Sequence, residues 1–135
     1  MAIATFLDTS VLLAGLIDFG TQSAPSQSLL HAVSERHVRE PGTAWHCCLE
    51  FYSVATRLPA EYRLSTADAH RLLEEEIFGR MAVHDLPAAD RLPMLRTAAS
   101  VVVTDNRRHF LSALRHGMRV ETPAEFLGRQ RTRAR

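Results

Sequence analysis

Short apolar runs and amphipathic stretches alternate along the chain. Residues 2–7 form an apolar run, and the cap-type residues 8–10 then precede a second apolar stretch over residues 11–16. This order predicts a strand followed by a helix. Further strands are expected at residues 43–45, 80–86, 100–104 and 118–121, and further helices around 29–37, at 46–58, 65–78 and 107–116, from Pro87 onwards and from Thr122 onwards.

Residues 100–104 are the strongest strand signal in the chain. This segment, Ser-Val-Val-Val-Thr, is β-branched and apolar on both faces, as is typical of a buried parallel strand. Because strands alternate with helices from end to end, the fold class is predicted to be α/β, with a mostly parallel central sheet flanked by helices. We expect Trp45 to lie in the core.

The length of 135 residues fits one compact domain. We place this domain at residues 1–127 and expect the basic tail, residues 128–135, to be frayed. No apolar run approaches the ~20 residues of a membrane helix, and the first residues lack the pattern of a signal peptide. The expected location is therefore the cytoplasm, with no membrane partner.

Composition narrows the possible chemistry. The 16 basic residues balance 15 acidic ones, so any binding to nucleic acid must be local. Every basic residue is an arginine, which excludes catalysis by a lysine Schiff base or a P-loop lysine. Cys47 and Cys48 are sequence neighbours, and a disulfide between neighbours is strained. We expect two buried free thiols, which suits a reducing compartment.

Three acidic residues follow predicted strands. Asp8 comes after the first strand, Glu50 lies about one turn into the helix after the second, and Asp105 follows residues 100–104. Ligands gather beyond the carboxyl ends of parallel strands, so these side chains should converge if their strands are neighbours. Clustered carboxylates repel one another unless a cation neutralises them. Oxygen ligands favour Mg²⁺ or Mn²⁺, which could activate a water and stabilise charge on a phosphate.

Each carboxylate also has a purely structural interpretation. Asp8 would cap the helix that follows it, and Asp105 or Asn106 would cap the next one. Glu50 lies on a polar helical stripe, and such stripes are usually solvated. The case for a functional site therefore rests on the three acidic positions together.

Arg107 and Arg108 follow Asp105 directly. Cations in the first turn of a helix oppose its dipole, so helix stability does not explain them. Contact with phosphate oxygens would explain them. The alternative is a pair of solvent-exposed arginines with little energetic consequence.

Four segments of the chain carry a family resemblance. They are Phe6-Leu7-Asp8-Thr9-Ser10-Val11-Leu12, Cys48-Leu49-Glu50-Phe51-Tyr52-Ser53-Val54, Val102-Val103-Thr104-Asp105-Asn106-Arg107-Arg108-His109-Phe110 and Val120-Glu121-Thr122-Pro123-Ala124-Glu125-Phe126-Leu127. Together they resemble the PIN-domain ribonucleases, specifically the VapC toxins of bacterial toxin–antitoxin pairs. The resemblance implies a three-layer fold and a Mg²⁺-dependent endonuclease that cuts structured RNA such as tRNA. It also implies a homodimer that is inhibited by a cognate VapB-type antitoxin.

The resemblance further implies roles for single residues. Asp8 and Glu50 match metal-binding acids. The last acidic position of the family falls on Asn106 or on the preceding Asp105, and both stay candidates. The remaining candidates are Arg107 and Arg108 for the substrate phosphate, and Thr9, Ser10 and Thr104 in supporting roles.

One piece of the family pattern is absent. Family members carry a Gly-rich turn and a Tyr-Asp-Ala-x-x-Ala helix, whose Asp is a principal metal ligand, just before the Val-Val-Thr strand. Here residues 92–99 run straight into Ser100, and no Asp lies between Arg91 and Thr104. Two functions stay open: a metal-dependent endoribonuclease toxin, and a degenerate PIN scaffold that binds antitoxin or RNA without cutting.

Overall fold

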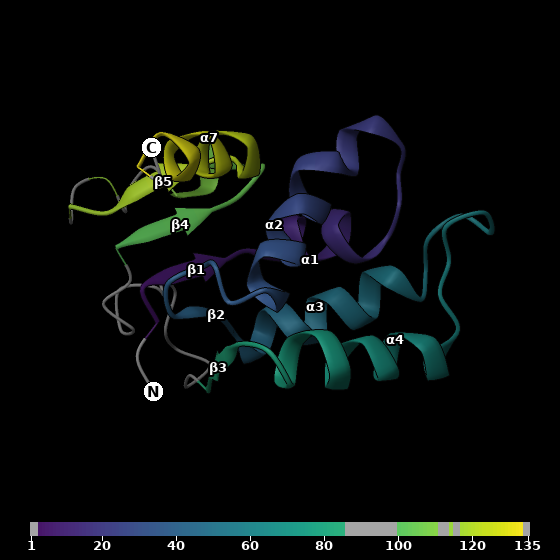
Figure 1. Ribbon diagram of the computed structural model, residues 1–135. Helices are drawn as coiled ribbons and strands as arrows, with labels where there is room; N and C mark the ends of the chain where they lie inside the picture. The colour runs from purple at the N-terminus through teal and green to yellow at the C-terminus, as the bar shows by residue number, and fades with distance from the viewer. Residues whose placement is uncertain (1–2, 86–99, 111–113, 115–116, 134–135) are drawn as a thin grey trace.

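The computed structural model describes residues 3–85, 100–110, 114 and 117–133 (Figure 1). The strands are β1 (Thr5–Leu7), β2 (Pro41–Ala44), β3 (Ala82–His84), β4 (Val101–Val103) and β5 (Arg119–Glu121). The α-helices are α1 (Thr9–Leu16), α2 (Ala24–Ser34), α3 (Trp45–Ala55), α4 (Thr66–Leu72) and α7 (Pro123–Arg133). Two 3₁₀ turns, η1 (Thr21–Ser23) and η3 (Arg107–Phe110), and a π-helical segment that continues α4, η2 (Leu73–Phe78), complete the described elements.

All five strands are parallel and form one sheet in the order β3-β2-β1-β4-β5. The predicted α/β class with a parallel sheet is confirmed, and the arrangement is consistent with a three-layer PIN-like fold. The central strand β1 pairs with β4, where Leu7 lies opposite Val103. The strand order reverses between β1 and β4, and in open α/β sheets ligands bind at the carboxyl ends of the strands at such a point.

The helices α1 to α4 pack along one side of the sheet (Figure 1). Helix α1 contacts both α2 and α3, and α7 contacts α2 and β5. The helical stretch expected from Pro87 onwards, and the junction at Ala99 and Ser100 where the family helix is absent, involve residues 86–99, outside the described part of the chain. None of the described helices is long and apolar enough to cross a membrane.

The core lies where the helices meet the sheet. Its largest fully buried side chains include Phe6, Leu7, Leu12, Phe51 and Phe126. Each comes from an apolar run that the sequence pattern assigned to a strand or a helix. Burying one such side chain contributes roughly 1.5–3 kcal/mol, so this core is the main favourable term in folding.

The expectation that Trp45 lies in the core is wrong. β2 ends at Ala44, and Trp45 begins α3 instead of continuing a strand over residues 43–45. Its side chain is 44% exposed and stacks on Phe78, with ring centroids 5.8 Å apart. The reason is rotation of α3: Trp45 shares a helical face with the exposed Leu49, while Cys48 and Phe51 take the inner face.

The C-terminal tail is also more ordered than the sequence suggested. Helix α7 continues to Arg133, so residues 128–133 are helical where we expected a frayed tail. Arg129 Nε lies 3.0 Å from Glu121 Oε1, and its guanidinium lies over the Phe126 ring. These contacts hold the second half of α7 against the end of β5. The helix expected at 107–116 opens as a 3₁₀ turn, η3.

Candidate functional site

Side-chain hydrogen bonds around Asp8 join the carboxyl ends of β1 and β4. The hydroxyls of Thr104 and Ser10 both donate to Asp8 Oδ2, over 2.9 Å and 3.2 Å. Each hydroxyl has a single proton to donate. When both protons point at Asp8, the two hydroxyl oxygens, 3.4 Å apart, are not hydrogen-bonded to each other. The carboxylate of Asp8 is therefore oriented by two donors on the same oxygen.

The same two hydroxyls hold the turn that follows β4. Ser10 Oγ accepts the backbone N–H of Asp105 over 3.1 Å, and Thr104 Oγ1 accepts that of Asn106 over 2.9 Å. Thr104 is fully buried, and its own N–H donates to the carbonyl of Glu121. The position of Asp105 is thus set by the groups that also orient Asp8.

Asp8 and Asp105 interact electrostatically. Burial raises the pKa of Asp105, and the negative charge of Asp8 raises it further. The charge of Asp8 therefore opposes the ionisation of Asp105 in the protein alone. A cation between the two carboxylates would remove the cost of ionising Asp105 beside Asp8. Such repulsion between neighbouring carboxylates is typical of metal sites without their ion.

The structure overturns the interpretation of Asp8 as a helix cap. Asp8 occupies the N-cap position of α1, but its side chain makes no capping hydrogen bond. The hydroxyls of Ser10 and Thr104 engage the carboxylate instead. The Asp8 side chain therefore links the ends of β1 and β4 and does not cap α1.

Cys47 is buried close enough to Asp8 to feel its charge. Burial raises the pKa of the Cys47 thiol, as does the charge of Asp8, while hydrogen bonds with Thr9 and Thr43 lower it. Burial raises the pKa of Cys48 to about 12. Both cysteines are buried and free, as expected from the sequence.

Glu50 does not join the other two acidic residues. No group of three or more His, Cys, Asp or Glu side chains within the described ranges is placed to hold a metal ion. Glu50 is exposed on α3, whereas Cys47, nearly one turn earlier, is buried and feels the charge of Asp8. The structure therefore brings Asp8 and Asp105 together, and the expected convergence of three carboxylates is not found among these residues.

The two arginines after Asp105 differ in their surroundings. Arg107 forms an exposed ion pair with Glu125 in the first turn of α7, with a separation of 3.5 Å. The backbone hydrogen bond with Thr122, followed by the charge of Arg107, lowers the pKa of Glu125. Arg108 and Asn106 are exposed on the same turn. The structure thus ties Arg107 to α7, beside the acidic pair.

A cavity of about 310 Å³ lies next to Asp105. Its lining residues are Ala14, Phe19, Gln22, Ser23 and Asp105. Apart from Asp105, none of these residues was a candidate from the sequence. The only signal in this region was the loop composition of residues 20–26, which predicts a connection and no particular chemistry.

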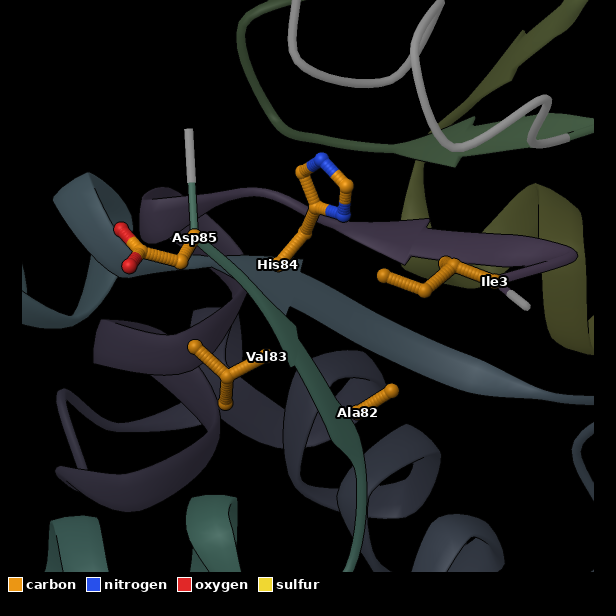
Figure 2. Close-up of a pocket in the computed structure, with 5 residues that line it drawn as sticks. All are labelled: Ile3, Ala82, Val83, His84 and Asp85. Carbon is orange, nitrogen blue, oxygen red and sulfur yellow. The ribbon is translucent and has the colours of Figure 1, made fainter. Parts of the chain in front are cut away.

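A separate cavity of about 260 Å³ lies at the β3 edge of the sheet (Figure 2). It is lined by Ile3, Ala82, Val83, His84 and Asp85. Figure 2 shows Val83 and His84 pointing to opposite sides of β3. A Cβ at Gly42 would overlap the Ile3 side chain and the Ala82 carbonyl oxygen, so only glycine lets Ile3 pack this closely on β2. β2 and β1 separate this cavity's strand from β4 and the acidic pair.

Comparison with known proteins gives no family assignment, since no protein-family model matches the chain and no curated protein does either.

Proposed function

We propose that this chain is a Mg²⁺-dependent endoribonuclease toxin of the VapC type, with Mn²⁺ as an alternative ion. The observation that carries the proposal is the pair Asp8 and Asp105 at the carboxyl ends of adjacent parallel strands. The hydroxyls of Ser10 and Thr104 hold the carboxylate of Asp8, and Ser10 also accepts the backbone N–H of Asp105. The resemblance of the four sequence segments supports the remaining parts: structured RNA such as tRNA as substrate, a homodimer, a VapB-type antitoxin as inhibitor, and a cytoplasmic location.

The donor set around Asp8 fits a hard divalent cation. It consists of carboxylate and hydroxyl oxygens, and Mg²⁺ commonly binds one or two protein carboxylates together with waters and substrate phosphates. Both hydroxyls donate to Asp8 Oδ2, and no described residue donates a hydrogen bond to Oδ1, which leaves Oδ1 available to a cation. When bound by Asp8 and Asp105, Mg²⁺ would supply a Lewis acid for the attacking water and for the charge that develops on the phosphate.

The residues of the chain have distinct tasks in this proposal. Ser10 and Thr104 orient Asp8, because both of their protons are directed at its carboxylate. Asp105 would supply the second carboxylate for the ion, and the cation would offset the repulsion from Asp8 that raises the pKa of Asp105 in the metal-free protein. Arg108 offers positive charge to the RNA phosphates from the turn after the acidic pair. Additional proposed contributors are Glu50 from α3, Asn106 and Arg107 from the turn after β4, and Thr9 from α1.

Cleavage of total tRNA in Mg²⁺ tests the proposal. Wild type should produce fragments that EDTA abolishes, and Asp8→Ala should produce none while keeping its fold by circular dichroism. Glu61→Gln is the matched control, because Glu61 is an exposed acidic side chain outside the site. Cleavage by Asp8→Ala at the wild-type rate would overturn the metal-site assignment.

The second candidate is a degenerate scaffold that binds antitoxin or RNA without cutting. The absence of a third acidic ligand among the described residues favours it. Filter binding of tRNA by wild type, combined with no cleavage in either Mg²⁺ or Mn²⁺, would select the scaffold over the nuclease.

A further inference from the structure

We propose that the cavity beside Asp105 is a subsite for the base of a nucleotide that adjoins the scissile phosphate. The inference rests on the proposed function and deepens it, because it names the part of the RNA that the site contacts besides the phosphate. We define the base subsite as Ala14, Phe19, Gln22, Ser23 and Asp105, the lining of this cavity.

The position of the base subsite carries the first step. Asp105 belongs both to the cavity lining and to the acidic pair. A phosphodiester held at the acidic pair therefore places one of its two adjoining nucleotides against the cavity. The volume of about 310 Å³ lies at the lower end of small-ligand pockets, which suits a single base with part of its ribose.

The chemistry of the lining carries the second step. Proteins bind unpaired RNA bases by stacking them on aromatic side chains and by hydrogen bonds to their edges. Phe19 supplies an aromatic ring and Gln22 an amide with both donor and acceptor atoms. Ala14, on the wall formed by α1, is small and leaves the volume open. A neutral base also fits beside Asp105 better than a second phosphate would.

The loop that carries Phe19 is held in place before any ligand arrives. Ser23 Oγ accepts the backbone N–H of Phe19 over 2.9 Å and donates to the carbonyl of Ile17 over 3.2 Å. Gly20 has a φ of 97°, a conformation that favours glycine, and its N–H is bound by Asp18. The Phe19 ring also packs on Tyr62, with centroids 5.0 Å apart. A preformed subsite binds with little ordering cost.

Titration with the four nucleoside 5′-monophosphates, in Mg²⁺ and followed by NMR, tests the base subsite. Ribose 5-phosphate is the probe that lacks a base. At least one nucleotide should bind wild type about fivefold or more tightly than ribose 5-phosphate, the lower end expected for stacking on an aromatic ring. Phe19→Leu, which keeps the bulk and loses the ring, should abolish this advantage, whereas Phe19→Tyr should keep it.

Two further variants sharpen the test. Gln22→Ala changes an exposed side chain and should reduce the differences in affinity among the four nucleotides. Phe78→Leu removes an exposed aromatic ring of η2, which packs on β3, and β3 is separated from β4 by β2 and β1; this variant should change nothing. Affinity for ribose 5-phosphate should be the same in all four variants.

The outcomes separate this inference from the proposed function. If wild type binds no nucleotide more tightly than ribose 5-phosphate, or if Phe78→Leu removes the advantage as fully as Phe19→Leu, the base subsite is refuted. If Gln22→Ala and Phe19→Leu both leave the base preference intact, it is refuted as well. If instead the Phe19-dependent preference is present but tRNA is not cleaved, the subsite stands and the nuclease proposal fails.

Discussion

Thr104 at the end of β4 donates a 2.9 Å hydrogen bond to Asp8 at the end of β1, from a position 96 residues away in the sequence. The same hydroxyl accepts the N–H of Asn106. One buried side chain thus connects the carboxylate of one strand with the turn that follows the other. Changes at Thr104 should therefore affect the site and the fold together.

Thr104→Val tests this connection, because valine keeps the shape and lacks the hydroxyl. The free energy of unfolding should fall by roughly 1–3 kcal/mol, the usual cost of leaving buried polar groups without a partner. Tenfold or greater loss of tRNA cleavage should accompany it, since Asp8 loses a donor that orients it. Thr104→Ser restores the hydroxyl and should recover most of both quantities. Urea unfolding and initial cleavage rates measure them, and a fully active valine variant would contradict the positioning role.

Asp105→Asn should make the metal-free protein more stable at pH 7. Burial and the charge of Asp8 raise the pKa of Asp105 above its ordinary value of 3.8, so the ionised side chain costs the fold stability above that raised pKa. Below the ordinary value the proton is bound in both folded and unfolded chains, and the cost is absent. The advantage of Asp105→Asn should therefore disappear as the pH falls below 3.8. Urea unfolding in EDTA across this range measures it.

The matched comparison for Asp105→Asn is Glu61→Gln, which neutralises an exposed carboxylate elsewhere. This variant should shift the unfolding free energy little at any pH. A gain in Glu61→Gln equal to that in Asp105→Asn would attribute the effect to net charge. It would then remove the evidence for repulsion between Asp8 and Asp105.

Mg²⁺ should stabilise wild type and stabilise Asp8→Asn much less. A ligand that binds only the folded state raises the melting temperature in proportion to the logarithm of its concentration once the site is nearly saturated. Asp8→Asn removes one of the two charges that attract the ion. Thermal melting over a Mg²⁺ titration, with EDTA as the metal-free reference, measures the difference. Equal shifts in both proteins would place the bound ion elsewhere.

Both cysteine thiols should remain protonated and unreactive in the native protein at pH 8. Burial raises the pKa of Cys48 to about 12 and also raises that of Cys47. Since the thiolate is the reactive species, Ellman's reagent should label neither residue until the chain is unfolded in urea. Rapid labelling of the native protein would show that α3 opens away from the sheet.

The capping box at Thr122 shows what local sequence decides. The last helix is expected from Thr122 onwards, and the structure has both reciprocal hydrogen bonds of a capping box there, Thr122 N–H to Glu125 Oε1 and Glu125 N–H to Thr122 Oγ1. The strand at residues 101–103 and the α/β class could likewise be predicted. These features depend on neighbours within a few residues, or on a regular alternation along the chain.

The candidate site could be predicted only in part. The sequence placed Asp8 and Asp105 after strands that prove adjacent, and their electrostatic interaction follows from that adjacency. It could not show that Glu50 faces solvent, because a helical residue's surroundings depend on how the helix is rotated against the sheet. The exposure of Trp45 has the same cause.

The sequence alone determined the fold class, the order of the strands and α-helices in the described part of the chain, and the two acidic residues that follow β1 and β4. Tertiary structure alone decided that Ser10 and Thr104 clamp Asp8, and that Phe19 and Gln22 line a cavity with Asp105. The physical reason is range. Periodicity and capping act within one element, whereas a clamp between strands and a cavity between loops arise only when residues distant in the chain pack side by side.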